Sequence, residues 1–215
     1  MKKRIGLLGG TFDPLHFGHL QLAEIAMSQC CLDRILFIPA ANPPHKTDRR
    51  IAGFQHRVNM LRLVLAHRPV LQLTTLEGDL PSPSYTIDTL ACLARKCPHG
   101  GEFYFILGVD AFLEIDTWKS YRELLMRTNF IVAGRSGCSF DAFEALALSL
   151  GYVPKDGIWL YPSADMEMHY LSEATDDISS SAVREAIRRG LSLHGLVPEE
   201  VIDYIEENNL YEGLD

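Results

Sequence analysis

Short apolar runs alternate with helical patterns from residue 4 to residue 133, and this alternation restricts the fold more than any other feature. The strand-like runs are Arg4–Gly9, Arg34–Pro39, Val70–Leu76, Phe103–Leu107 and Asn129–Ala133. Continuous apolar runs are typical of parallel strands buried on both faces, and parallel strands need crossover connections. The sequence therefore predicts an α/β fold: a doubly wound, Rossmann-like parallel sheet with helices on both faces.

Helical spacing identifies the remaining segments. We expect helices from about His16 to Cys30, from Phe54 to Leu65 and over Thr86–Lys96, where apolar residues recur on one side. After Asp177 the pattern is helical again, and Pro198 opens a last helix. With no repeat, low-complexity segment or linker, residues 1–215 are predicted to form a single domain with a small helical C-terminal part.

Composition argues against several classes of protein. Hydrophobic residues make up 47% of the chain and the net charge is −8, which is unlike a nucleic-acid-binding surface. No apolar run is long enough for a membrane span. The 5 cysteines are odd in number and include no CxxC pair, which favours a reducing, cytoplasmic location without disulfides. We expect neither nucleic acid nor membrane as a partner, and the sequence leaves a homo-oligomer open.

The segment Gly9–His19, GGTFDPLHFGH, joins the first predicted strand to the first predicted helix. Ligands of open parallel sheets bind at the carboxyl ends of strands. Gly9 and Gly10 let the backbone approach a ligand and expose its N–H groups. His16 and His19 share one face of the helix start, where imidazoles suit a phosphate chain better than a metal. The alternative is a glycine-rich turn that merely carries histidines; neither a GxGxxG nor a Walker motif is present.

This segment resembles the HxGH signature of the nucleotidyltransferase α/β superfamily, and more closely the bacterial nicotinate mononucleotide adenylyltransferases. Further blocks of the resemblance follow in the family's order: Pro43–Lys46, Pro83–Leu90, Gly108–Asp110 with Trp118, and Ile178–Arg184. They cover nearly the whole chain. One departure is Leu80, which stands where such proteins commonly carry an arginine and leaves a local ion pair or loop geometry in question.

The resemblance implies transfer of AMP from ATP to nicotinate mononucleotide, giving nicotinic acid adenine dinucleotide and pyrophosphate in NAD biosynthesis. It implies direct in-line attack without a covalent intermediate. It also implies Mg²⁺ as a cofactor that is bound by the ATP phosphates, with no protein side chain assigned as its ligand. The acceptor phosphate is already an anion, so catalysis rests on positioning and charge stabilisation. The alternatives are another acceptor, nicotinamide mononucleotide or phosphopantetheine, and a non-catalytic nucleotide-binding regulator.

Catalytic roles are assigned to His16 and His19, which would stabilise charge on the transferred phosphoryl group, and to Arg184, which would hold pyrophosphate. The serines Ser179, Ser180 and Ser181 stand at a predicted helix start, where serine side chains cap some backbone N–H groups and leave other N–H groups free to bind an anion. The alternative is an ordinary serine cap that binds no ligand. Asp110 could meet ribose or a hydrated Mg²⁺, or simply cap a turn. The predicted ATP-binding residues are Gly9, Gly10, Thr11, Phe12, Gly108, Asp110, Ile178, Ser179 and Ser180.

The predicted acceptor-binding residues are Asn42, His45, Lys46, Tyr85, Thr86, Trp118 and Arg135. The helix start at Thr86 offers unpaired N–H groups, which suit the carboxylate that distinguishes nicotinate from nicotinamide. Trp118 could stack on the pyridine ring, or be an ordinary half-buried tryptophan. His45 and Lys46 suit the acceptor phosphate, with a solvated loop as the alternative, and Arg135 is a phosphate candidate by resemblance alone.

Overall fold

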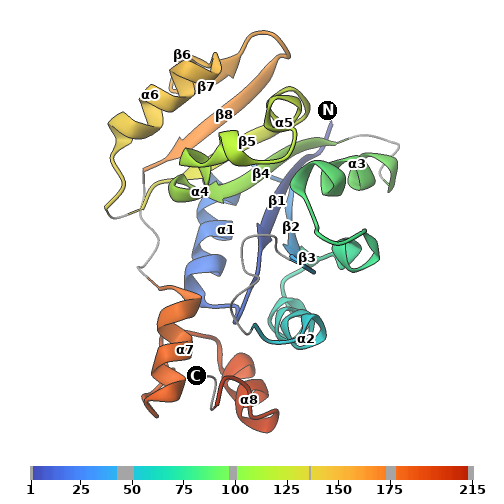
Figure 1. The fold of residues 1–215 in the computed structure, drawn as a ribbon, viewed down its shortest axis with the longest axis vertical. Helices are drawn as coiled ribbons and strands as arrows, with labels where there is room; N and C mark the ends of the chain where they lie inside the picture. The colour runs from blue at the N-terminus through green and yellow to red at the C-terminus, as the bar shows by residue number, and fades with distance from the viewer. Residues whose placement is uncertain (1, 43–50, 97–100, 136, 173–177, 213–215) are drawn as a thin grey trace.

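The computed structural model describes residues 2–42, 51–96, 101–135, 137–172 and 178–212, built around an eight-stranded sheet (Figure 1). The strands are β1 Arg4–Gly10, β2 Arg34–Pro39, β3 Leu71–Leu73, β4 Glu102–Gly108, β5 Asn129–Ala133, β6 Val153–Lys155, β7 Ile158–Tyr161 and β8 Met166–Leu171. Their order is β3-β2-β1-β4-β5-β8-β7-β6. Pairing is parallel from β3 to β8, and antiparallel where β7 and β6 extend the sheet.

The predicted α/β doubly wound class is confirmed, but the sequence analysis missed β6, β7 and β8. β6 (Val-Pro-Lys) and β8 (Met-Glu-Met-His-Tyr-Leu) mix polar and apolar residues, and the apolar run of β7 is only four residues long, so these strands near one edge lack the pattern of a central strand. The third predicted strand is also shorter than expected. β3 ends at Leu73, and Leu76–Asp79 forms the 3-10 helix η1, in which Gly78 N–H donates to Thr75 O.

The helices cover both faces of the sheet. They are α1 Phe17–Gln29, α2 Phe54–Leu65, α3 Thr86–Lys96, α4 Val109–Leu113, α5 Tyr121–Arg127, α6 Phe140–Leu150, α7 Ser180–Arg188 and α8 Glu199–Glu207, with a second 3-10 helix, η2, at Ile115–Thr117. Helices α1, α2, α7 and α8 contribute to one buried cluster, and α3 to α6 contribute to the other. Figure 1 shows α7 and α8 together beyond the end of β1, beside α2.

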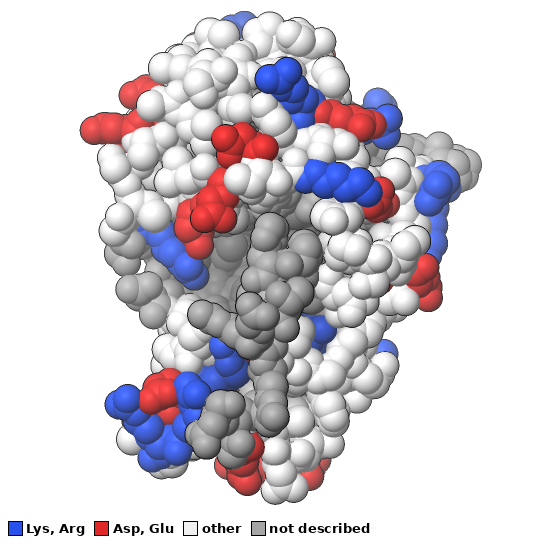
Figure 2. Space-filling model, in the orientation of Figure 1, with Lys and Arg blue, Asp and Glu red and all other residues white. Residues whose placement is uncertain are grey.

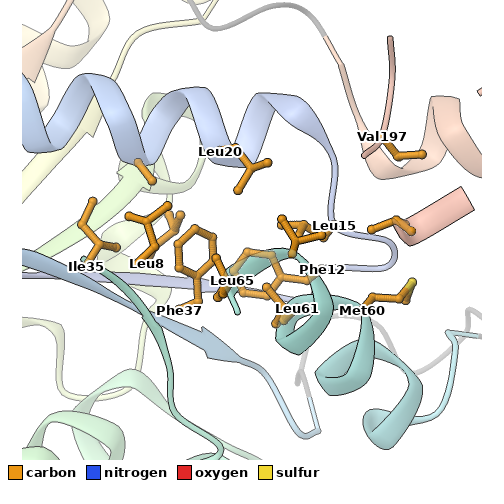
Figure 3. Packing of buried hydrophobic residues seen from close by; sticks show 14 of the residues in the cluster. Leu8, Phe12, Leu15, Leu20, Ile35, Phe37, Met60, Leu61, Leu65 and Val197 are labelled. Atoms are coloured by element: carbon orange, nitrogen blue, oxygen red, sulfur yellow. The ribbon is translucent and has the colours of Figure 1, made fainter. Parts of the chain in front are cut away.

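Alternation along the strands supplies both clusters. In β2, Ile35 and Phe37 face α1 and α2, whereas Leu36 and Ile38 face the opposite side. Figure 3 shows Phe37 packed beneath Leu20 of α1. Because both faces of the central strands are buried, the register of the sheet is fixed: a slip of one residue would exchange the two clusters.

The direction of the crossovers changes at β1, and this positions the site. The connections β1–α1–β2 and β2–α2–β3 place their helices on one face, whereas α3 lies on the other face before β4. The carboxyl ends of the neighbouring strands β1 and β4 therefore open a crevice between the helices, which is where open α/β sheets bind ligands. Among the residues that the structure describes, no helix is both long and apolar enough to cross a bilayer.

Candidate active site

The β1–α1 turn folds against the core through Phe12. This residue has a φ of 50° and a fully buried side chain, which lies 5.6 Å from the Phe37 ring and 4.9 Å from the His19 ring between centroids. Figure 3 shows Phe12 and Leu15 of this turn packed near α2. Phe12 was predicted to bind ATP; its ring is a packing element that supports His19, so only its backbone is available to a ligand.

His16 and His19 meet at the start of α1. The His16 N–H donates to His19 Nδ1 at 3.3 Å, and the His19 N–H donates to His16 O at 3.0 Å. An Nδ1 atom that accepts a hydrogen bond leaves the ring proton on Nε2, so this contact orients the His19 ring as an Nε2–H donor. His16 is 4% exposed, and burial followed by the positive charge of Arg135 lowers its pKa to about 4. His16 is therefore a neutral ring at physiological pH.

The Ile178–Arg184 block lies directly against this turn, although it is distant in sequence. A Cβ on Gly18 would come within 3.3 Å of Ile178 O, so glycine permits the close approach. Ser180 Oγ donates to Pro14 O at 3.1 Å, and Arg184 Nη1 donates to Asp13 O at 2.6 Å. The structure thus brings Arg184 and the two histidines to one end of the sheet.

Ser179 is the N-cap of α7, because its Oγ accepts the Ala182 N–H at 3.1 Å. The ordinary-cap interpretation therefore holds for its side chain. Capping by Ser179 leaves other first-turn N–H groups of α7 available to an anion. Figure 2 shows Lys and Arg side chains over α7 with an acidic side chain among them; Arg188 and Arg189 pair with Glu185, whereas Arg184 reaches the β1–α1 turn. This end of the molecule is suited to phosphate.

A cavity of about 370 Å³ opens beside the β1–α1 turn. Its lining comes from the ends of β1, β2 and β4, from η1 and the start of α3, and from the segment around η2. Seven predicted site residues line it: Gly9, Gly10, Thr11, Tyr85, Thr86, Gly108 and Trp118. Trp118 stands edge-on to Phe105, with ring centroids 6.0 Å apart at 88°, so the half-buried indole both packs and forms a cavity wall.

Two charged residues that the sequence analysis did not select also line this cavity. Lys119 Nζ lies 2.9 Å from Asp88 Oδ2 and 4.5 Å from the Tyr85 ring centroid. Glu77 is 9% exposed and accepts hydrogen bonds from Thr89 Oγ1 at 2.8 Å and Ala41 N at 3.4 Å. Burial raises the pKa of Glu77, against the opposing effect of its hydrogen bonds. Because Lys119 lines the cavity, it offers a positive charge there, which it shares with Asp88.

Other predicted residues lie apart from the cavity lining. Asp110 Oδ2 and Arg135 Nη1 are 3.4 Å apart, and both side chains are exposed. Arg135 was predicted to bind the acceptor; its positive charge contributes, after burial, to the lowered pKa of His16. The Asn42 backbone oxygen accepts from Ser84 N at 3.3 Å. His45 and Lys46 lie outside the described residues.

Leu80 packs against the buried cluster of α3 to α6. It also lines a second hollow of about 390 Å³ beyond Tyr85 and Lys119. An apolar side chain in this position fits its neighbours, and nothing further in the structure explains the departure from arginine.

Comparison with known proteins agrees with this arrangement. Residues 7–186 match the family model described as cytidylyltransferase-like. The chain belongs to this family. A Desulfotalea psychrophila protein named "Probable nicotinate-nucleotide adenylyltransferase" is 43% identical over 97% of this chain and 100% of its own length. A Pelobacter propionicus protein of the same name is 39% identical, covering 97% of this chain and 98% of the relative. The resemblance inferred from the sequence is confirmed.

Solved structures share the fold of this cytidylyltransferase-like chain. The Plasmodium falciparum nicotinic acid mononucleotide adenylyltransferase complexed with NaAD superposes with a TM-score of 0.75, at 23% identity and with 97% of each chain covered. The similarity of fold extends over nearly the whole chain.

Arg57 is a structural residue of this cytidylyltransferase-like site that sequence reasoning missed. It is 1% exposed, and its guanidinium donates to Thr11 O at 2.7 Å, Ala40 O at 2.8 Å and Ala52 O at 2.9 Å. These carbonyls belong to the turns that follow β1 and β2. Arg57 thus ties together two loops, and Thr11 and Ala40 line the cavity.

Metal ligands are scarce in the described part of the chain. Within it, no group of three or more His, Cys, Asp or Glu side chains could hold a metal ion. The donors at this end of the sheet are instead N–H groups, imidazoles and guanidinium groups, which suit an anionic ligand.

Proposed function

We propose that this protein transfers AMP from ATP to nicotinate mononucleotide, producing nicotinic acid adenine dinucleotide and pyrophosphate for NAD synthesis. The carrying observation is a convergence of three features at the carboxyl ends of β1 and β4. The Gly9–His19 turn and the Ile178–Arg184 block lie against each other, and the cavity walled by Trp118 opens beside them. Relatives that match over nearly their full length carry the corresponding name.

The ATP half of the site is assigned to the glycines and to the helix starts. Gly9, Gly10 and Gly108 let the nucleotide lie close to the strand ends. His19, oriented through Nδ1, would donate from Nε2 to the transferred phosphoryl group, while neutral His16 supports its ring. Arg184 would hold the departing pyrophosphate at the first turn of α7.

The acceptor half is assigned to the cavity. The pyridine ring of nicotinate mononucleotide would lie against Trp118, and its carboxylate would receive hydrogen bonds from the first turn of α3 at Thr86. Lys119 adds a positive charge on the same wall. An amide in place of the carboxylate would lose the attraction to Lys119. Its own N–H groups would also face the N–H donors at the start of α3, so this wall favours the acid.

The reaction balances without a protein base. An oxygen of the acceptor phosphate forms a bond to the α-phosphorus of ATP. The bond from that phosphorus to the oxygen bridging the α- and β-phosphates breaks. Pyrophosphate carries away the electron pair. Because the nucleophile is already ionised, the protein contributes alignment of the two phosphates and stabilisation of the developing charge.

We also propose that ATP binds as its magnesium complex, with the ion carried by the phosphates, where it would reduce their negative charge. His19 and Arg184 would bind the remaining phosphate oxygens directly. We place the reaction in the cytoplasm, with small-molecule substrates as the partners.

A pyrophosphate-release assay tests the proposal. With ATP and Mg²⁺, we expect rapid release with nicotinate mononucleotide, slower release with nicotinamide mononucleotide, and none with 4′-phosphopantetheine. Faster turnover with either of the other acceptors would reassign the substrate. Absence of release with all three, despite measurable ATP binding by calorimetry, would favour a non-catalytic nucleotide-binding regulator.

A further inference from the structure

Asp13, in the β1–α1 turn, is a buried charge that connects remote parts of the chain. Its side chain is 1% exposed. Oδ1 accepts hydrogen bonds from the Tyr211 hydroxyl at 2.8 Å and from Ala52 N at 3.0 Å, and Oδ2 lies 3.4 Å from Arg184 Nη1. A carboxylate buried to this degree is tolerated only when such partners satisfy it.

Arg184 is held through this aspartate. Its Nη1 donates to the Asp13 main-chain oxygen at 2.6 Å and lies near Oδ2, while Nη2 donates to Ser181 Oγ at 3.2 Å. The side chain of Arg184 is 18% exposed, so the guanidinium is anchored on one side and reachable on the other. Anchoring matters because a free arginine loses rotamer entropy when it binds an anion.

Tyr211 is itself fixed in place. It is 3% exposed, belongs to the buried cluster of α1, α2, α7 and α8, and has a φ of 67°. Burial and the adjacent Asp13 charge raise the pKa of its hydroxyl far above the usual value, so it remains a donor over the whole physiological range. The hydroxyl therefore directs one oxygen of Asp13 and leaves the other facing Arg184.

We propose that Tyr211 is a positioning residue for adenylyl transfer, acting through Asp13 to fix the Arg184 guanidinium where it meets the leaving pyrophosphate. This inference rests on the proposed function. Without the hydroxyl, Oδ1 of Asp13 keeps only Ala52 N, and the carboxylate turns to recover a second donor. Arg184 then loses the defined direction of its anchor, although the fold and the acceptor cavity persist.

Tyr211→Phe tests this inference, because it removes the hydroxyl and keeps the ring. Tyr204→Phe is the matched control: the Tyr204 hydroxyl on α8 contacts His56 Nδ1 and Asn59 Nδ2, both at 3.0 Å, and neither belongs to the site. We expect similar decreases in the urea midpoint for the two variants. Only Tyr211→Phe should lower kcat, by about ten- to a hundredfold, with KM for nicotinate mononucleotide unchanged.

Two further measurements separate positioning from general weakening of the fold. Inorganic pyrophosphate should bind Tyr211→Phe more weakly than the wild type in calorimetry, and bind Tyr204→Phe as the wild type does. In an Arg184→Lys background, Tyr211→Phe should cost much less in kcat than it costs alone, because the group through which it acts is already altered.

Normal kcat and pyrophosphate affinity in Tyr211→Phe would overturn the inference. Equal losses in both tyrosine variants, or the same fold loss with and without Arg184→Lys, would also overturn it. These results differ from failure of the proposed function, which would appear as absent turnover in the wild-type protein with nicotinate mononucleotide.

Discussion

The imidazole rings of His16 and His19 lie 3.7 Å apart between centroids, at an interplanar angle of 32°. Two positive rings at this separation would repel each other strongly in a site shielded from water. Burial and Arg135 already hold the pKa of His16 near 4, so the arrangement combines one neutral ring with one hydrogen-bond donor. On the proposed function, His19 would therefore act on phosphate through a directed N–H group, and the pair would not rely on summed positive charge.

Replacement of His19 by alanine removes the proposed donor to the transferred phosphoryl group. Loss of one such preorganised donor costs about 10²- to 10³-fold in kcat. We therefore expect pyrophosphate release to fall by that factor, with little change in the urea midpoint. His19→Asn is the control for local structure, because its side-chain oxygen can accept the His16 N–H in place of Nδ1. Normal turnover of His19→Ala would remove this residue from the mechanism.

The buried His16 should make stability depend on pH. Its folded pKa of about 4 lies below the ordinary 6.5, so the unfolded chain takes up a proton first as the pH falls. His16 therefore destabilises the fold progressively below about pH 6.5, by at most about 1.4 kcal/mol per pH unit.

Urea unfolding between pH 7.5 and pH 4.5 measures this contribution. The wild type should lose more stability across the range than His16→Asn, which has no titrating ring. Identical slopes for the two proteins would show that His16 is not held neutral by the fold.

Lys119→Met should reduce discrimination between acid and amide acceptors. The Lys119 side chain is partly exposed and already forms an ion pair with Asp88. Its contribution to binding the acceptor carboxylate should therefore be no larger than that of a surface ion pair. We expect KM for nicotinate mononucleotide to rise about two- to fivefold, with little change for nicotinamide mononucleotide. Lys155→Met, on the exposed strand β6, is the matched control. Equal changes for both acceptors would assign Lys119 to the structure of the cavity instead.

Arg57→Met should destabilise the protein strongly. Three partly buried carbonyls would lose their donor, at about 1–3 kcal/mol for each group left unpaired. We expect the free energy of unfolding to fall by at least about 3 kcal/mol, as measured in urea. Arg62→Met on the same helix removes an exposed contact to Asn59 and should change stability by about 0.5 kcal/mol or less. A similar small effect at Arg57 would contradict its role in joining the two loops.

The central part of the fold and much of the site were predictable because their signals are local. The apolar runs of β1, β2, β4 and β5 mark strands buried on both faces, and the segment Gly9–His19 carries its chemistry within a single turn. The strands β6 and β7 gave a weaker signal, because Val153, Pro154 and Lys155 are all exposed and the apolar run of β7 is only four residues long.

The supporting residues could not be predicted, since their roles arise only from contacts across the fold. Arg57 lies in an amphipathic helix and resembles any surface arginine until the carbonyls of three loop residues surround it. The Glu77 carboxylate is held by hydrogen bonds from the Thr89 hydroxyl and the Ala41 backbone N–H. Sequence spacing carries no information about these pairings, whereas it does fix which residues of the first turn share a face.

The anchoring of Asp13 also has a consequence during synthesis. Its two long-range side-chain partners, Arg184 and Tyr211, follow it by 171 and 198 residues, so the first turn leaves the ribosome long before they do. A nascent chain that already exposes β1 to β5 contains Ala52, which donates to Asp13 Oδ1, but still lacks both of these long-range partners. If Arg184 binds the leaving pyrophosphate as proposed, its anchor is therefore complete only when α7 and the residues that follow α8 have emerged.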